Sequence, residues 1–148
     1  MSVSYPQLAL DEQLCFALHS TMLAMNKVYR KVLKPLGLTY SQYLVMLVLW
    51  QQDQQSVSQI GERLFLDSAT LTPLLKRMES RQLLRRERSN KDERQVIVTL
   101  TESGRQLQHQ AAGIPKTVGC ATHCDTGQVI SLRNQLTELR QALMNADL

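Results

Sequence analysis

Three cysteines, Cys15, Cys120 and Cys124, carry the most reactive side chains in this sequence of 148 residues. Their number is small and odd, which is atypical of a disulfide scaffold, so each thiol is interpreted on its own. Cys15 falls near the start of a predicted helix, where free N–H groups and the helix dipole can stabilise a thiolate. The apolar neighbours Leu14 and Phe16 are also typical of an inert cysteine packed in a core. Position alone leaves both interpretations open.

Cys120 and Cys124 form a second cluster with His123, between the last two predicted helices. A Cys-x-x-x-Cys spacing with one histidine offers three possible metal ligands, but a fourth ligand and a paired second motif are missing. We therefore expect neither a metal site nor another cofactor. Cys124 is interpreted as a bystander thiol.

Long amphipathic helices are predicted at both ends of the chain. From Asp11 to about Leu33 apolar residues recur every three or four positions, and Pro35 and Gly37 end this helix. A final helix from about Asp125 to Ala146 repeats the pattern. Its apolar positions are Val129, Leu132, Leu136, Leu139 and Leu143. These end helices carry more apolar surface than the small centre can cover, which predicts a symmetric homodimer.

Two capping boxes open the first helices of the centre, Thr39 with Gln42 and Ser56 with Gln59. The apolar run from residue 43 to 50 predicts that the first of these helices is buried on every face. The second is short. Together they predict a compact core.

A fourth helix, capped by Asp67 or Ser68 and containing Pro73, leads into a β-hairpin. The hairpin strands are residues 83–88 and 95–100, and residues 89–93 form a charged loop. Thr101 caps a fifth helix whose course becomes uncertain around residues 113–115. The apolar face of the fourth helix is formed by Leu71, Leu74, Leu75 and Met78.

Positive charge is concentrated in one fifth of the chain. Residues 63–94 hold nine basic and five acidic side chains, and this excess equals the whole net charge of +4. Such a cluster is typical of a protein with a polyanionic partner, although most charged runs are solvated surface.

A helix pair followed by a charged hairpin is the order of a winged helix-turn-helix, whose second helix enters the major groove of DNA. We expect base contacts from the small residues at its start and phosphate contacts from cations farther along it. Arg94, beside Asp92 in the hairpin, suits the minor groove. The predicted partner is palindromic double-stranded DNA, with half-sites about 34 to 36 Å apart. The expected DNA-binding residues are Asp67, Ser68, Thr70, Lys76, Arg77, Arg81, Asp92 and Arg94.

The central region resembles the MarR family of winged-helix repressors. The matching residues are Gly61, Leu66, Asp67, Ser68, Thr70, Leu71, Leu74, Leu75, Asp92, Glu93, Arg94, Leu100, Thr101 and Gly104. The resemblance implies a mainly α fold with a small β-hairpin wing. It also implies a single domain, with dimerisation helices at residues 1–38 and 101–148 around a DNA-binding module at residues 39–100.

The N-terminal half is similar to one branch of that family, the organic hydroperoxide resistance repressors, through residues 14–18, 34–40 and 42–46. This similarity implies that Cys15 is a peroxide-sensing thiol held by the hydroxyls of Tyr29 and Tyr40. It also implies that Cys120 is the resolving thiol of a two-cysteine member. His19 departs from the branch, which often has tyrosine at that position.

The positions of Cys15 and Tyr29 constrain how such a sensor assembles. Fourteen residues separate them on one predicted helix, which is about 21 Å at 1.5 Å per residue, so Tyr29 would have to approach the thiol of another subunit. The expected chemistry is oxidation of Cys15 to a sulfenic acid by an apolar hydroperoxide, then a disulfide with Cys120 of the partner. Closing that disulfide would alter the half-site spacing and release DNA.

Two alternatives stay open at this point. One is a thiol peroxidase, although no Cys-x-x-Cys redox motif is present and the basic module would be unexplained, so we expect no enzyme. The other is a repressor of the same fold that responds to a small aromatic ligand. The longest apolar run has eight residues, against about 20 for a membrane span, and no secretion signal is recognisable, so we expect a cytoplasmic protein without a membrane partner.

Overall fold

The computed structural model describes residues 4–148. They divide into two compact units, a first that ends at Ala112 and a second over Gly113–Leu148. The first unit contains most of the core and a small sheet, and the second contains two helices. Each unit is considered by itself below.

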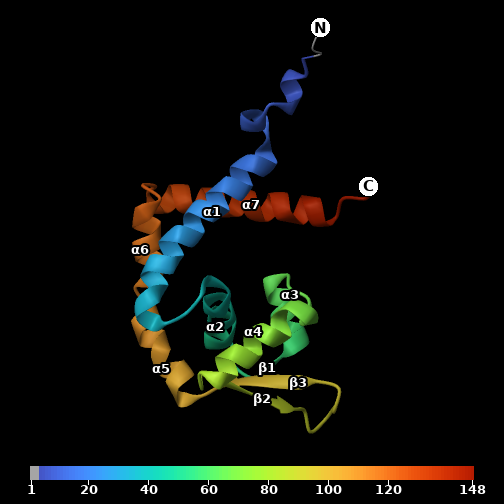
Figure 1. Cartoon of the computed structure of the whole chain (residues 1–148), viewed down its shortest axis with the longest axis vertical. Coiled ribbons are helices and arrows are strands. Elements are labelled where there is room, and N and C mark those ends of the chain that lie inside the picture. The colour runs from blue at the N-terminus through green and yellow to red at the C-terminus, as the bar shows by residue number, and fades with distance from the viewer. Residues whose placement is uncertain (1–3) are drawn as a thin grey trace. The chain divides into compact units, whose positions relative to one another are not determined.

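The first long helix, α1, spans Leu14–Leu33 without interruption (Figure 1). Its predicted start at Asp11 is wrong, because Leu10–Glu12 form a separate 3-10 turn and Gln13 is extended. Its predicted end is confirmed. A 3-10 turn over Lys34–Leu36 follows, and Gly37 then takes a left-handed conformation with φ of 67°.

Helix α2, Tyr40–Gln51, begins with the predicted capping box. The Thr39 hydroxyl accepts the N–H of Gln42 at 3.3 Å, while the Gln42 carbonyl oxygen Oε1 accepts the N–H of Thr39 at 3.1 Å. Most of the helix is core, as its composition predicts, but one position differs. Leu47 is 40% exposed, so the helix is not buried on every face.

Helices α3, Val57–Leu64, and α4, Ser68–Ser80, form the predicted helix-turn-helix. Phe65 ends α3 in a left-handed conformation, and the N–H of Leu66 returns to the carbonyl of Gly61 at 2.9 Å. Gly61 is needed at this close approach, since a Cβ there would lie 2.6 Å from the Leu66 carbonyl oxygen. The four predicted apolar residues of α4 are buried, which leaves its other side exposed.

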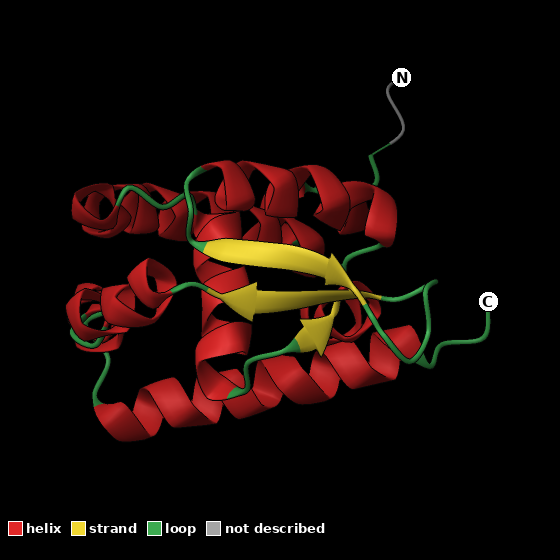
Figure 2. Cartoon of the chain, turned by 90° about the horizontal axis from the view of Figure 1, so that it is seen from below, coloured by secondary structure: helices red, strands yellow, loops and turns green. Residues whose placement is uncertain are grey.

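The hairpin consists of β2, Leu84–Arg88, and β3, Val96–Leu100, paired antiparallel from Leu84 with Leu100 to Arg88 with Val96. A third strand, β1 at Gln55–Ser56, pairs with the other edge of β3 (Figure 2). The sequence did not predict β1, because two residues cannot show the alternation that marks a strand. The observed fold is the expected mainly helical winged helix-turn-helix.

Helix α5, Glu102–Ala111, completes the first unit and is capped by Thr101 as predicted. The second unit contains α6, Ile114–Ala121, and α7, Thr126–Met144. Helix α6 occupies the segment whose course was uncertain from the sequence. Pro115 is compatible with it because proline is tolerated in the first turn of a helix.

Helix α7 begins with a capping box formed by Asp125 and Gln128, and none of its residues is buried. Large apolar side chains are exposed along it, among them Ile130, Leu132, Leu136, Leu143 and Met144. Across residues 4–148, no single helix has the length and hydropathy to cross a membrane. The segments Leu14–Leu36 and Tyr40–Gln51 meet those criteria only as a pair bent by 67°.

Candidate nucleic-acid interface and cysteine site

The start of α4 presents small polar side chains to solvent. Asp67, Ser68 and Thr70 are all exposed. Asp67 is the N-cap, and its Oδ1 accepts the N–H of Thr70 at 2.7 Å, which lowers the pKa of the carboxyl group. The carboxylate is therefore held in place by the helix that it begins. Thr70 also hydrogen-bonds to this carboxylate through its side chain, so Ser68 is the most available of the three for contacts to bases.

The cations farther along α4 fall into two groups. Lys76 and Arg77 are exposed, as a phosphate contact requires. Arg81, at the C-cap, instead donates through Nη1 to the carbonyl of Gly37 and to Oε1 of Gln42, the latter at 3.4 Å. Arg81 is exposed, but its guanidinium is engaged by two acceptors of its own chain, while the phosphate contact expected from the sequence stays a prediction.

The tip of the wing is ordered by its own hydrogen bonds. Asp92 accepts the N–H of Arg94 at 3.1 Å and lies 3.6 Å from its Nε, while the Arg94 side chain is 94% exposed. Arg94 is thus free to enter a groove, and Asp92 shapes the turn that presents it.

A partly exposed ion pair joins the wing to α4. The Glu79 carboxylate accepts the main-chain N–H of Arg86 at 2.8 Å and the guanidinium at 3.1 and 3.2 Å. The backbone hydrogen bond from Arg86, followed by the hydrogen bonds and charge of its side chain, lowers the pKa of Glu79. The sequence showed both charges without indicating that they meet.

Cys15 lies in the first turn of α1, one residue after the helix begins, and its free thiol is exposed. The N-cap Gln13 makes no side-chain hydrogen bond to the helix, and the first turn contains no acidic residue. Cys15 therefore lies at the end of the helix where the dipole is positive and main-chain N–H groups have no partner within the helix.

Tyr29 and Tyr40 stack on each other, with ring centroids 4.7 Å apart and planes inclined by 46°. Tyr43, which the sequence analysis did not select, joins them with its ring centroid 5.7 Å from that of Tyr29. Its spacing of three from Tyr40 on one helix could have indicated a shared face. Within the part of the chain that the structure describes, neither Tyr29 nor Tyr40 makes a hydrogen bond through its hydroxyl.

Burial raises the pKa of all three phenols. For Tyr29 the pKa rises to about 12, through desolvation first and then the nearby Tyr43 and Tyr40. The pKa values of Tyr40 and Tyr43 are also raised, mainly by desolvation. These hydroxyls stay protonated at neutral pH and can donate hydrogen bonds to an anion.

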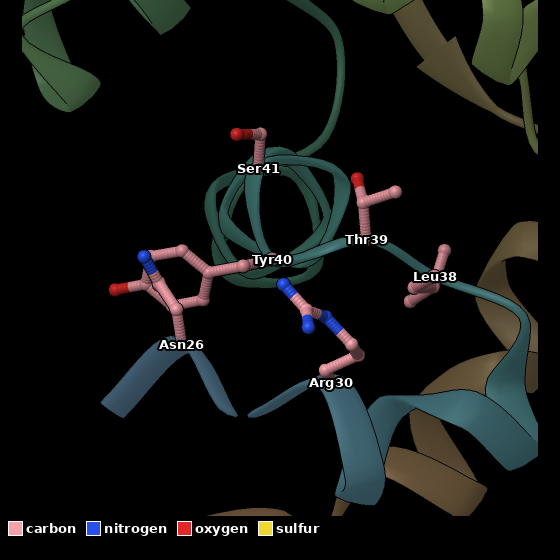
Figure 3. Close-up of a pocket in the computed structure, with 6 residues that line it drawn as sticks. All are labelled: Asn26, Arg30, Leu38, Thr39, Tyr40 and Ser41. Atoms are coloured by element: carbon pink, nitrogen blue, oxygen red, sulfur yellow. The ribbon is translucent and has the colours of Figure 1, made fainter. Parts of the chain in front are cut away.

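A cavity of about 380 Å³ opens beside Tyr40, between α1 and the start of α2. Figure 3 shows Asn26 and Arg30 projecting from α1 toward the first turn of α2, with the Tyr40 ring on the same side as Asn26. Among the described residues, no donor reaches the buried Oδ1 of Asn26. The remaining lining residues are Leu38, Thr39 and Ser41. The lining is mixed, more apolar than polar, carries one cation and has room for a small group.

The structure does not bring Cys15 to the tyrosines of its own chain. Because α1 is continuous, the fourteen positions from Cys15 to Tyr29 span about 21 Å. Cys120 is an exposed free thiol on α6, in the second unit, and Cys124 follows that helix. No group of three or more His, Cys, Asp or Glu side chains in residues 4–148 is placed to hold a metal ion.

Comparisons with known proteins relate this geometry to a family. The model of the SarA/Rot transcriptional regulator family matches residues 27–111. The chain is 47% identical over 135 residues to TtmR, an HTH-type transcriptional regulator of Methylorubrum extorquens, covering 91% of this chain and 69% of TtmR. It is 45% identical over 118 residues to the organic hydroperoxide resistance transcriptional regulator of Bacillus subtilis, covering 80% of each chain.

Solved structures of AbfR, a Staphylococcus epidermidis protein, are also similar. Reduced AbfR bound to DNA matches with a TM-score of 0.81 and 38% identity, over 93% of this chain and 94% of that one. Disulfide-formed AbfR matches with a TM-score of 0.62 and 39% identity, over 93% and 92%. The chain therefore belongs to the SarA/Rot family of winged-helix, DNA-binding transcriptional regulators, and its resemblance to MarR-type organic hydroperoxide regulators is confirmed.

Proposed function

We propose that this regulator is a peroxide-sensing repressor of the cytoplasm that binds palindromic double-stranded DNA as a homodimer and releases it when organic hydroperoxides oxidise Cys15. One observation carries the proposal. An exposed thiol lies in the first turn of α1, and two stacked tyrosines with unused hydroxyls lie too far along the same chain to serve it. A second copy of the chain can supply the tyrosine hydroxyls that Cys15 cannot reach within its own chain.

The name of the Bacillus subtilis relative supports organic hydroperoxides as the inducers. The existence of both a reduced DNA-bound and a disulfide form of AbfR supports a redox switch in a protein of this fold. The exposed apolar positions along α7 support a homodimer, because a soluble helix with such a face is normally covered.

In the proposed dimer, the Tyr29 and Tyr40 hydroxyls of one copy donate hydrogen bonds to the Cys15 thiolate of the other. Their raised pKa values suit this role, because a phenol that stays protonated remains a donor. The cavity beside Tyr40 leaves room for the hydroperoxide. Charge-assisted hydrogen bonds of this kind are stronger than neutral ones, so they favour the thiolate, which is the nucleophilic form.

The first step is attack of the Cys15 thiolate on the outer oxygen of the hydroperoxide. A sulfur–oxygen bond forms, the oxygen–oxygen bond breaks, and the alkoxide leaves and takes a proton to become an alcohol. In the second step the Cys120 thiolate of the other copy attacks the sulfenic sulfur, a disulfide forms, and hydroxide leaves as water after protonation. Two thiols and one hydroperoxide thus give one disulfide, one alcohol and one water.

The disulfide changes DNA binding through the geometry of the dimer. It requires Cα atoms about 4.4 to 6.8 Å apart, so the helices that carry the two cysteines have to approach. The two α4 helices would then no longer match half-sites about 34 to 36 Å apart. DNA affinity falls as a result.

The test uses a duplex selected by the reduced wild-type protein from a random-sequence pool. Its affinity is measured before and after one equivalent of cumene hydroperoxide per chain, and again after dithiothreitol. We expect reversible loss of binding in wild type and no loss in Cys15→Ser. Peroxide-induced release from Cys15→Ser would refute sensing by this thiol.

The resolving role of Cys120 is tested separately on a non-reducing gel. Oxidised wild type should give a covalent dimer band, and oxidised Cys120→Ser should not. Cys124→Ser is the matched control and should behave as wild type. A dimer band that persists in Cys120→Ser and disappears in Cys124→Ser would assign the role to the other thiol.

The cavity beside Tyr40, whose lining is more apolar than polar, favours a second candidate, a regulator of the same fold released by a small aromatic ligand rather than by oxidation. Arg30 could hold an acidic group there. If this candidate is correct, the aromatic ligand should release DNA from Cys15→Ser as fully as from wild type. The same variant therefore separates the two functions.

A further inference from the structure

Arg81 joins the end of α4 to the turn between α1 and α2. Its Nη1 donates to the main-chain carbonyl of Gly37, 44 residues away, and to Oε1 of Gln42, 39 residues away at 3.4 Å. Arg81 is also the C-cap of α4, where its own N–H bonds to the carbonyl of Arg77 at 3.2 Å. One side chain therefore fixes the end of the DNA-reading helix to a different part of the fold.

The turn is built to receive this guanidinium. Gly37 has a left-handed φ of 67°, and a Cβ at that position would lie 2.7 Å from Nη2 of Arg81. A side chain at residue 37 would be strained by its backbone and would also collide with the arginine. Gln42 is 6% exposed, so its oxygen is held at a fixed position rather than sampling solvent.

Gln42 connects Arg81 to the cavity beside Tyr40. Its Oε1 accepts both the Arg81 guanidinium and the N–H of Thr39, and its own N–H donates to the Thr39 hydroxyl. Thr39 and Tyr40 line the cavity. A displacement of the first turn of α2 would therefore move the Gln42 acceptor of Arg81 together with the Thr39 and Tyr40 lining of the cavity.

We propose that Arg81 is a positioning residue that couples the Tyr40 cavity to the orientation of α4, and that it does not contact DNA phosphate. Arg81 is exposed like Lys76 and Arg77, but the geometry gives its guanidinium two acceptors in its own chain, whereas among the described residues the Lys76 and Arg77 side chains make no hydrogen bond. The coupling, as distinct from the position of Arg81, rests on the proposed function.

The position of Arg81 is tested by the salt dependence of DNA binding, with Arg81→Gln compared with Arg77→Gln. Both changes remove one positive charge. Affinity for the selected duplex is measured with reduced protein between about 50 and 200 mM salt, where each lost phosphate contact lowers the slope of log affinity against log salt by about 0.9. Because a dimer contains two copies of Arg77, Arg77→Gln should lower this slope by about twice that amount. Arg81→Gln should keep the wild-type slope, and a fall equal to that of Arg77→Gln would overturn the proposal.

The coupling is tested by the ratio of dissociation constants after and before cumene hydroperoxide. We expect this ratio to fall at least about threefold in Arg81→Gln and to stay at the wild-type value in Arg77→Gln. An unchanged ratio in Arg81→Gln would refute the coupling. Gly37→Ala should reproduce the Arg81→Gln result, because it displaces the guanidinium while keeping every charge, and it also serves if Arg81→Gln fails to fold.

The two proposals fail in different ways. If wild type keeps its DNA after oxidation, peroxide sensing is wrong, while the salt slopes still decide whether Arg81 contacts phosphate. If wild type releases DNA and the variants release it equally well, peroxide sensing stands and the coupling by Arg81 is wrong.

Discussion

Replacing Gly104 by alanine should destabilise the first unit strongly. Gly104 is buried in the first turn of α5, and a Cβ there would lie 2.1 Å from the Leu83 carbonyl oxygen and 3.1 Å from Cδ2 of Leu100. The nearer obstacle is main chain, so no rotamer change relieves it. The Leu83 carbonyl is itself fixed by the N–H of Thr101 at 3.1 Å. The added methyl group of alanine therefore forces helix α5 and the start of the wing apart.

The cost has two parts. Overpacking of a filled core costs about 1 to 3 kcal/mol. Losing the hydrogen bond between Thr101 and Leu83 adds about 1 kcal/mol. The sum of about 2 to 4 kcal/mol is a large share of a typical unfolding free energy of about 5 to 15 kcal/mol.

Urea denaturation measures this cost directly, with the fluorescence of Trp50, the single tryptophan, as the probe. Its indole N–H donates to the Gly104 carbonyl at 2.9 Å, so the signal reports on the altered contact. Protein concentration is kept constant because dimer stability depends on it. Gly119→Ala, in α6 with nothing within 4 Å of the new Cβ, is the control and should be neutral or stabilising. A Gly104→Ala midpoint equal to that of wild type would refute this account of the contact.

Three further changes test other parts of the structure. Glu79→Gln should reduce the acid sensitivity of folding. Hydrogen bonds lower the Glu79 pKa in the folded protein, so the carboxylate stabilises the fold above its unfolded-state pKa, and this stabilisation is lost as pH falls through its folded-state pKa. Urea midpoints measured from pH 6 down to about 3 should therefore fall less in Glu79→Gln than in wild type. Leu136→Glu on α7 should give monomers by sedimentation and weak DNA binding, while exposed Asn134→Glu should stay dimeric; a dimeric Leu136 variant would exclude that face from the interface. Tyr29→Phe should slow oxidation of the sensing thiol about tenfold without unfolding the protein, because it removes one donor and keeps the stacked ring; an unchanged rate would remove that hydroxyl from the site.

The elements that local chemistry specifies could be predicted from the sequence. A helix N-cap depends on residues within about four positions of one another, so it leaves a signal in the sequence. Five helices of the structure begin at such a cap, formed by Thr39, Ser56, Asp67, Thr101 and Asp125. Strand β1 escaped prediction because it exists only through its pairing with β3. Helix α6 escaped because residues 113–115 left the course of the chain uncertain, whereas Pro115 lies in the first turn of a new helix.

In the candidate site, too, the residues in local motifs could be predicted and the contacts between distant residues could not. Cys15 and the two tyrosines could be selected from a resemblance of local motifs. The two acceptors of the exposed Arg81 side chain could not be predicted, because they lie about forty residues away and one of them is a main-chain carbonyl with no signature in the sequence. The same reason hid the pairing of Glu79 with Arg86, since either charge alone reads as solvated surface.

The central claim is that oxidation of one thiol controls DNA affinity, and a single titration tests it. Reduced wild-type protein on the selected duplex receives increasing cumene hydroperoxide, and the same samples are digested and examined by mass spectrometry. The account predicts that DNA release follows the appearance of the peptide linking Cys15 to Cys120 and is complete near one equivalent per chain. Full oxidation of Cys15 with DNA still bound would contradict it.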